Sequence, residues 1–310
     1  MTRKRKRRAN QEAFESAFAA VPTDTYKHRV LAHLADVYSA IRPLAWLDSK
    51  RRLNFVGSSL LFEVGTTRLL VTAAHVLDEE ARHGPLHVAT PAGQTTVGGL
   101  RRWTQAPDGD RDADPFDLGF VVLDPQTSQA LASCRHLTLE DVDPSLEDPE
   151  LPEDCLAIGF PGNWVSHSDP ATAVATPMFA VGPRLKASEH QGLGVAEPFH
   201  ALMGFDKESS VDLEGPRIPP DPFGMSGGGL WRFSSLRRGQ EARNRLLGVL
   251  IEWRGPTLIA TRAGVLLSAI RDLVPGASAE LSDAAPPDLR NERERTEPER
   301  RRTDAQEPGD

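Results

Sequence analysis

Short apolar runs separated by turn residues dominate the middle of the chain. From about residue 46 to residue 274, stretches rich in Val, Leu and Phe alternate with clusters of Gly, Pro and Asp. Runs of this length between turn residues are typical of the strands of an all-β domain. The pattern predicts strands at 58–64, 68–72, 118–123, 155–160, 177–181, 228–233 and 246–253.

The two ends of the chain have a different texture. Residues 1–45 begin with a basic run at 3–8 and continue as an Ala-rich segment with helix-like spacing, broken at Pro22. Residues 277–310 are rich in Glu, Arg and Pro and have almost no apolar side chains. We therefore expect a basic arm and helical extension, a folded body closed by a short helix at 265–274, and a disordered charged tail.

Composition and charge favour a soluble cytoplasmic protein. Hydrophobic residues make up 39% of the 310 positions and the net charge is −8, so the folded body is not expected to bind nucleic acid. Cys134 and Cys155 are the only cysteines, which favours a reducing compartment. The residues after the basic run are too polar for the core of a signal peptide. No stretch approaches the roughly 18 uninterrupted apolar residues of a membrane span.

The basic run at 3–8 has two interpretations. It is either a solvated arm or a tether to nucleic acid or to an acidic membrane surface. A run of charge is a weak signal taken alone, so we expect the solvated arm.

Candidate chemistry begins with Ser226, which lies among glycines in the segment 223–230, Phe-Gly-Met-Ser-Gly-Gly-Gly-Leu. Glycines allow backbone conformations that other residues avoid, and they allow backbone N–H groups to converge on one point, as an oxyanion hole requires. The alternative is a tight glycine turn in which the serine has no role.

A serine nucleophile needs a base, and the base needs a carboxylate to orient it. Of the nine histidines, His75 lies at the end of the apolar run 69–77, after two small alanines. Asp117 begins the apolar strand 118–123, where an unpaired carboxylate would be costly and a histidine N–H is a natural partner. The nearby acids Asp108, Asp110, Asp112 and Asp114 are expected to form a solvated acidic loop, because an EF-hand would need Gly where Ala113 stands and Glu where Gly119 stands.

Chain order separates the folds that use such a triad. In α/β-hydrolases the histidine follows the serine, whereas every histidine here precedes Ser226. Subtilisin-like enzymes place an aspartate before the histidine, and no Asp before His75 has a suitable strand-ending context. The order His75, Asp117, Ser226 is that of chymotrypsin-like enzymes.

Three segments in this order resemble the signatures of the trypsin-like (chymotrypsin-fold) serine protease family: 72–75 (Thr-Ala-Ala-His), 117–121 (Asp-Leu-Gly-Phe-Val) and 224–228 (Gly-Met-Ser-Gly-Gly). The resemblance covers about residues 46–274. It implies two six-stranded antiparallel β-barrels with the active site between them, the first at 46–130 and the second, with a closing helix, at 131–276. It also implies an oxyanion hole formed by the N–H groups of Gly224 and Ser226.

The chain departs from the family at two places. Members activated by cleavage have an Asp before the serine, and this chain has Met225, so we expect no zymogen switch. The position that holds an Asp in trypsin holds Pro220, with Asp221 beside it. Further substrate-binding candidates by resemblance are Glu252 and Trp253 on a strand that binds the substrate backbone, and Gly264 at the far wall of the pocket; an acid there, Asp221 or Glu252, could select a basic side chain.

No cofactor or metal is expected. Cys134 and Cys155 lack a C-x-x-C partner, and His83 and His87 are separated by Gly84 and Pro85.

Two classes of function fit these residues. The first is a serine endopeptidase that cuts peptide or protein substrates; the second is a catalytically silent trypsin-like domain that binds peptides or proteins. An active protease held latent is a variant of the first, with a regulatory protein partner acting through 1–45 or 277–310.

Overall fold

The computed structural model describes most of the chain between residues 37 and 281. The described residues are 37–105, 113–146, 154–162, 165–169, 172–175, 177–186, 193, 195, 198–205, 221–233, 245–277 and 281. The predictions for the basic run, for the helical extension before residue 37 and for the tail after residue 281 lie outside these residues.

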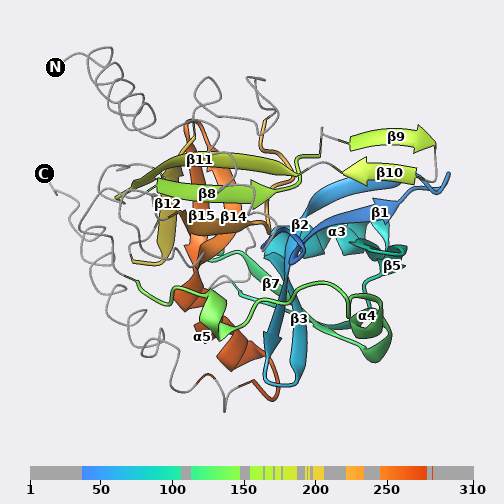
Figure 1. The fold of residues 1–310 in the computed structure, drawn as a ribbon, viewed down its shortest axis with the longest axis horizontal. Coiled ribbons are helices and arrows are strands. Elements are labelled where there is room, and N and C mark those ends of the chain that lie inside the picture. The colour runs from blue at the N-terminus through green and yellow to red at the C-terminus, as the bar shows by residue number, and fades with distance from the viewer. Residues whose placement is uncertain are drawn as a thin grey trace, which may run out of the picture.

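The strands form two barrel-like bodies packed side by side (Figure 1), which confirms the all-β, two-barrel class. The second body is a closed barrel of six strands in the order β11-β12-β15-β14-β13-β8. Its strands are β8 (Asp154–Gly159), β11 (Met178–Leu185), β12 (His200–Gly204), β13 (Gly229–Phe233), β14 (Leu246–Arg254) and β15 (Thr257–Arg262). A separate two-stranded sheet pairs β9 (Val165–Asp169) with β10 (Thr172–Ala175).

The first body is a sheet of seven strands, one more than expected, in the order β5-β4-β1-β2-β3-β7-β6. Its strands are β1 (Ile41–Leu47), β2 (Leu53–Val64), β3 (Thr67–Ala73), β4 (Leu86–Thr90), β5 (Gly93–Thr96), β6 (Gly99–Trp103) and β7 (Leu118–Leu123). β5, at one end of this sheet, pairs with β4 after a two-residue turn. Its residues, Gly-Gln-Thr-Thr, are polar and largely exposed, so no apolar pattern marks it.

The central strands of the first body are buried on both faces. In β3, Leu69 and Val71 join a cluster that includes residues of β8, β14 and the closing helix. Leu70 joins a second cluster, which also includes residues of β12, β14 and β15. Successive side chains of a strand point to opposite faces, so both faces of β3 are covered. The shared cluster packs the two bodies together and fixes how segments far apart in sequence meet.

Four short helices accompany the sheets in the part of the chain that the structure describes. They are α3 (Ala74–His83), α4 (Pro125–Ala130), η2 (Leu139–Asp141) and the closing helix α5 (Ala263–Leu273). The apolar run 69–77 is divided between β3 and the start of α3, and the helix expected at 265–274 is α5. Among the described residues, no helix has both the length and the apolar character needed to cross a membrane.

The edges of the folded body differ from the expected boundaries. β1 begins at Ile41, so a boundary at residue 46 cuts through a strand that Arg42 and Pro43 disguise. At the other end, Ala277 and Leu281 are wholly buried in the shared cluster. The folded body therefore extends beyond both expected limits.

Candidate active site

Strand pairing brings His75 and Asp117 together. β3 and β7 are antiparallel and Ala73 pairs with Leu118, so the residue that follows β3 and the residue that precedes β7 lie at the same edge. His75 is the second residue of α3, directly after β3. The local sequence thus places a histidine and an aspartate at adjacent strand ends.

Three hydrogen bonds hold Asp117. Its carboxylate accepts from the backbone N–H of His75 at 2.9 Å and from the ring Nδ1 of His75 at 2.5 Å. Its carbonyl oxygen accepts from the N–H of Ala74 at 2.8 Å. Asp117 has φ +45, a left-handed conformation that is costly for a residue with a side chain. The bonds to α3 stabilise this conformation and aim the carboxylate at the ring.

The electrostatics of the pair favour a charged imidazole. Burial lowers the pKa of His75, but the hydrogen bond to Asp117 and the negative charges of Asp117, Asp78 and Glu79 outweigh it, so the pKa is raised above 6.5. A carboxylate only accepts hydrogen bonds, so Nδ1 carries the hydrogen and Nε2 of the neutral ring is free to accept a proton.

The chain before Asp117 is held by buried polar groups, which corrects one expectation. Asp114 was expected to be solvated, but it is only 7% exposed and accepts from the Thr104 hydroxyl at 2.7 Å and the Phe116 N–H at 3.1 Å. Across the interface, Thr261 of β15 donates its hydroxyl to the carbonyl of Phe116 at 2.6 Å. The second barrel therefore supports the loop that carries Asp117. Asp108, Asp110 and Asp112 lie outside the described residues.

Ser226 lies in the segment 221–228, called the serine turn below, in which two positions require glycine. Gly224 has φ +92 and Gly227 has φ +85. A Cβ at Gly227 would lie 2.0 Å from the carbonyl oxygen of Ser58 and 2.2 Å from Oγ1 of Thr72. The turn is thus pressed directly against β2 and β3 of the first body.

The N–H groups of Gly224 and Ser226, on either side of Met225, have no acceptor among the described residues. The carbonyl of Phe223 accepts from Gly162 N at 2.8 Å, and that of Met225 accepts from Gly228 N at 2.8 Å. In a trans peptide the N–H points away from the carbonyl, so these bonds fix the direction of both free N–H groups. Two unengaged donors beside a serine hydroxyl are what an oxyanion hole requires.

The serine turn meets the histidine across Gly57 of β2. A Cβ at Gly57 would lie 2.7 Å from both methyl groups of Val76, the residue after His75, and 3.1 Å from the carbonyl oxygen of Ser226. The Ser226 hydroxyl itself donates to the carbonyl of Ile251 at 3.4 Å, and within the described structure it makes no hydrogen bond with His75. The direction of a serine Oγ changes by rotation about the Cα–Cβ bond. Hydrogen bonds between a serine and a histidine of an active site are often long in the absence of substrate.

The residues proposed to bind substrate are only partly brought to this site. Trp253 packs edge-on against Phe223 with ring centroids 5.4 Å apart. Glu252 forms an ion pair with Arg254, so its charge is compensated. Asp221 is half-buried at the start of the serine turn, and Pro220 lies outside the described residues.

Gly264, the other candidate for the pocket wall, precedes the body of the closing helix. It lies in the first turn of α5, where a Cβ would be 2.5 Å from the carbonyl oxygen of Pro144. The residues that pair with Glu252 and Trp253 are Ile259 and Leu258 of β15, both buried. The place of Gly264 at the far wall of a substrate pocket stays a prediction.

Phe223 was missed by the sequence analysis. It is 68% exposed, the highest value among the large hydrophobic residues that the structure leaves exposed, and it directly precedes Gly224. The sequence contained one signal for Phe223, which is its position directly before the glycine motif.

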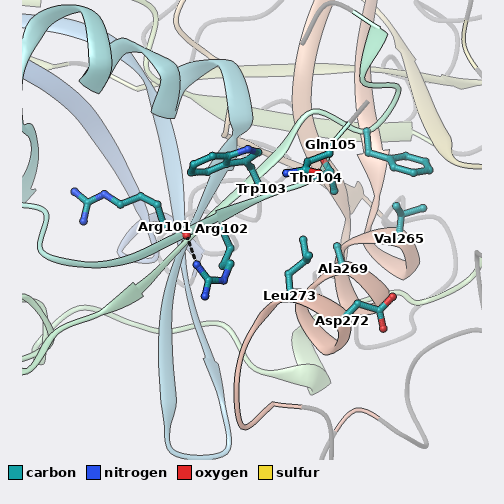
Figure 2. A pocket seen from close by; sticks show the side chains of 10 residues that line it. Arg101, Arg102, Trp103, Thr104, Gln105, Val265, Ala269, Asp272 and Leu273 are labelled. Atoms are coloured by element: carbon teal, nitrogen blue, oxygen red, sulfur yellow. Dashed lines mark hydrogen bonds between the residues drawn. The ribbon is translucent and has the colours of Figure 1, made fainter. Parts of the chain in front are cut away.

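A pocket of about 480 Å³ lies away from the serine turn, between β6 and α5 (Figure 2). Arg102 and Trp103 line one side and Leu273 lines the other. Phe116 also contributes, which connects the pocket to the loop before Asp117.

No cluster of three or more metal-ligating side chains occurs among the described residues. Cys134 and Cys155 are buried free thiols that belong to different core clusters. His83 packs its ring on Trp46 with centroids 4.3 Å apart.

No family model and no curated protein matches the chain. Among solved structures, it is similar to one from work on how aromatic interactions drive the coupled folding and binding of the intrinsically disordered Sesbania mosaic virus VPg protein, at 14% identity over 72% of this chain and 85% of that chain, with a TM-score of 0.40. It is also similar to the Rv3671c protease in an inactive form, at 14% identity over 78% of this chain and 93% of that chain, with a TM-score of 0.41. Similarity at this level assigns no activity to the chain.

Proposed function

We propose that the protein is a serine endopeptidase of the trypsin-like class, with His75, Asp117 and Ser226 as its catalytic triad. One observation carries the proposal: a histidine–aspartate pair bonded at 2.5 Å lies next to a serine turn with two unengaged N–H donors. A structural glycine turn has no need of a half-buried aspartate nearby that is held at positive φ and bonded to a histidine.

In the proposed reaction, Nε2 of His75 takes the proton of the Ser226 hydroxyl as Oγ bonds to the peptide carbonyl carbon. The carbonyl π electrons move to its oxygen, which the N–H groups of Gly224 and Ser226 stabilise. The C–N bond then breaks, and the amine leaves with the proton from His75. Water, deprotonated by His75 in the same way, releases the acyl group and restores the serine.

The groups beside the turn favour an apolar substrate side chain over a basic one. Phe223 and Trp253 offer aromatic surface next to the oxyanion donors. Glu252, one of the two acids that could select Lys or Arg, is compensated by Arg254. We therefore expect cleavage beside apolar residues.

The uncleaved chain is expected to be active. Met225, where cleavage-activated proteases have an acid, is 2% exposed and packs against Gly159 in an apolar cluster. Because Met225 carries no charge, it needs no newly formed N-terminus as an ion-pair partner. The N–H groups of Gly224 and Ser226 are therefore expected to be in place without cleavage.

A silent peptide-binding domain is the alternative, and one observation favours it: the Ser226 hydroxyl is bonded to the carbonyl of Ile251 rather than to His75.

The proposed location is the cytoplasm, and the two free cysteines support it. A regulatory partner that acts through the terminal segments stays a prediction.

Digestion of an unfolded protein such as casein by the full-length chain separates these functions. We expect cleavage by the wild type and none by Ser226→Ala or His75→Ala, with all three equally folded by circular dichroism. Binding of casein by wild type and Ser226→Ala alike, without products from either, would establish the silent domain instead.

A further inference from the structure

Ser58 in the first body makes hydrogen bonds to the serine turn with both its side chain and its backbone. This residue of β2 is fully buried. Its hydroxyl donates to the carbonyl of Gly224 at 3.0 Å and accepts from the N–H of Phe160 at 2.8 Å. Its own N–H donates to the carbonyl of Ser226 at 2.7 Å. One side chain therefore connects three segments that are far apart in sequence.

Thr72 holds Ser58 from the other side. Its hydroxyl donates to the Ser58 carbonyl at 2.7 Å, and Gly227 packs against both groups where a side chain would not fit. Ser58 is thus fixed by β3, the strand that leads to His75.

Four consecutive carbonyls of the serine turn are occupied. Those of Phe223, Met225 and Ser226 bind backbone N–H groups, of Gly162, Gly228 and Ser58 respectively. The carbonyl of Gly224 alone binds a side chain, the Ser58 hydroxyl. The Gly224–Met225 peptide lies between the two peptides that supply the free N–H donors, and Gly224 itself, at φ +92, resists rotation least.

We propose that Ser58 is a positioning residue, whose hydroxyl locks the Gly224–Met225 peptide and so keeps both oxyanion donors aimed at one point. This inference rests on the proposed function. Ser58 touches no reacting atom. Its contribution is to the stabilisation of the oxyanion and not to the basicity of His75, which Asp117 controls independently.

Ser59 is a matched control. It is the next residue of β2, is equally buried, and donates its hydroxyl to a single carbonyl, that of Arg42 in β1, at 3.1 Å. Removing this hydroxyl costs a buried hydrogen bond, as at Ser58, but leaves the serine turn untouched.

The test is the second-order rate at which a fluorophosphonate probe modifies Ser226 in the full-length chain, measured against pH. Phosphonylation places an oxygen in the oxyanion hole, so its rate reports the donors. We expect Ser58→Ala to lower the plateau rate about tenfold or more, since small misplacements of catalytic groups have effects of this size. The midpoint of the acid limb should not move. Ser58→Thr keeps the hydroxyl and should recover most of the rate, and Ser59→Ala should stay within about twofold of wild type.

The outcomes are distinct. A Ser58→Ala rate equal to that of wild type, or an equal loss in Ser59→Ala, overturns the inference while the proposed function stands. A wild type that is not labelled overturns the proposed function and this inference with it. If Ser58→Ala does not fold, Ser58→Cys, which keeps the shape and only a weak donor, takes its place, and an undiminished rate there overturns the inference.

Discussion

The two halves of the candidate site are held in different ways. His75 and Asp117 contact each other directly through side chains, and their geometry follows from the pairing of β3 with β7. Ser226 is fixed through the backbone of its turn, while its hydroxyl remains on the Ile251 carbonyl. The proposed base is therefore already paired with its carboxylate, whereas the hydroxyl of the proposed nucleophile is bonded elsewhere. Mutations in the two halves should accordingly impair the proposed activity in different ways.

Asp117→Asn should have the largest effect. The amide can donate to Nδ1, which favours the wrong ring tautomer, so kcat should fall about 10⁴-fold, as in the equivalent change in a serine protease triad. Casein cleavage and probe labelling measure this loss. Asp48→Asn, in the exposed turn after β1, is the control and should leave both rates unchanged. A small loss in Asp117→Asn would show that Asp117 does not orient the base.

Gly227→Ala should disable the serine half alone. A Cβ would overlap the Ser58 carbonyl oxygen, so the turn must move, and labelling should fall by about 10²-fold or more. Gly276→Ala has nearly the same φ, +84, with open space around it. That control should lose about 1–3 kcal/mol of stability from backbone strain and keep its labelling rate. Equal labelling of the two variants would contradict the tight contact between turn and strand.

Thr261→Val tests how the second barrel supports the histidine half. The change leaves the buried Phe116 carbonyl without this donor, and should cost about 1–3 kcal/mol in the free energy of unfolding. Denaturant unfolding measures the cost, and labelling should fall modestly because the loop before Asp117 loosens. Thr257 lies on the same strand, and its buried hydroxyl has no partner among the described residues. Thr257→Val should therefore leave the free energy of unfolding unchanged or raise it. A decrease equal to that of Thr261→Val would contradict the claim that the Thr261 hydrogen bond supports the loop before Asp117.

The pH dependence should show the smallest effect. The proposed mechanism needs neutral His75, whose pKa is raised above 6.5, so the rate should fall as pH drops through a midpoint above that value. Asp78→Asn removes one of the charges that raise this pKa, and should move the acid limb slightly towards lower pH. Labelling rates across pH measure both midpoints. A shift towards higher pH would have the wrong sign for a charge effect.

The sequence was informative where function depends on local pattern. The apolar strands that precede His75 and follow Asp117 were predicted, and so was the glycine turn around Ser226. The polar β5 and the arginine-containing β6 were not, because short strands at a sheet's end carry too little apolar periodicity.

Ser58 and Asp114 show what local pattern does not contain. Each is a polar residue whose role comes from a tertiary contact: Ser58 with segments about 100 and 166 positions away, and Asp114 with the Thr104 hydroxyl. A buried serine and a buried aspartate look, in sequence, like surface residues.

The most direct measurement is the mass of the tryptic peptide that contains Ser226 after the uncleaved full-length chain has reacted with a fluorophosphonate. We predict a single phosphonyl adduct on Ser226 in the wild type, and none in His75→Ala under the same conditions. An unmodified Ser226 in folded wild-type protein, or equal modification when His75 is absent, would contradict the claim that an imidazole held by Asp117 activates this serine.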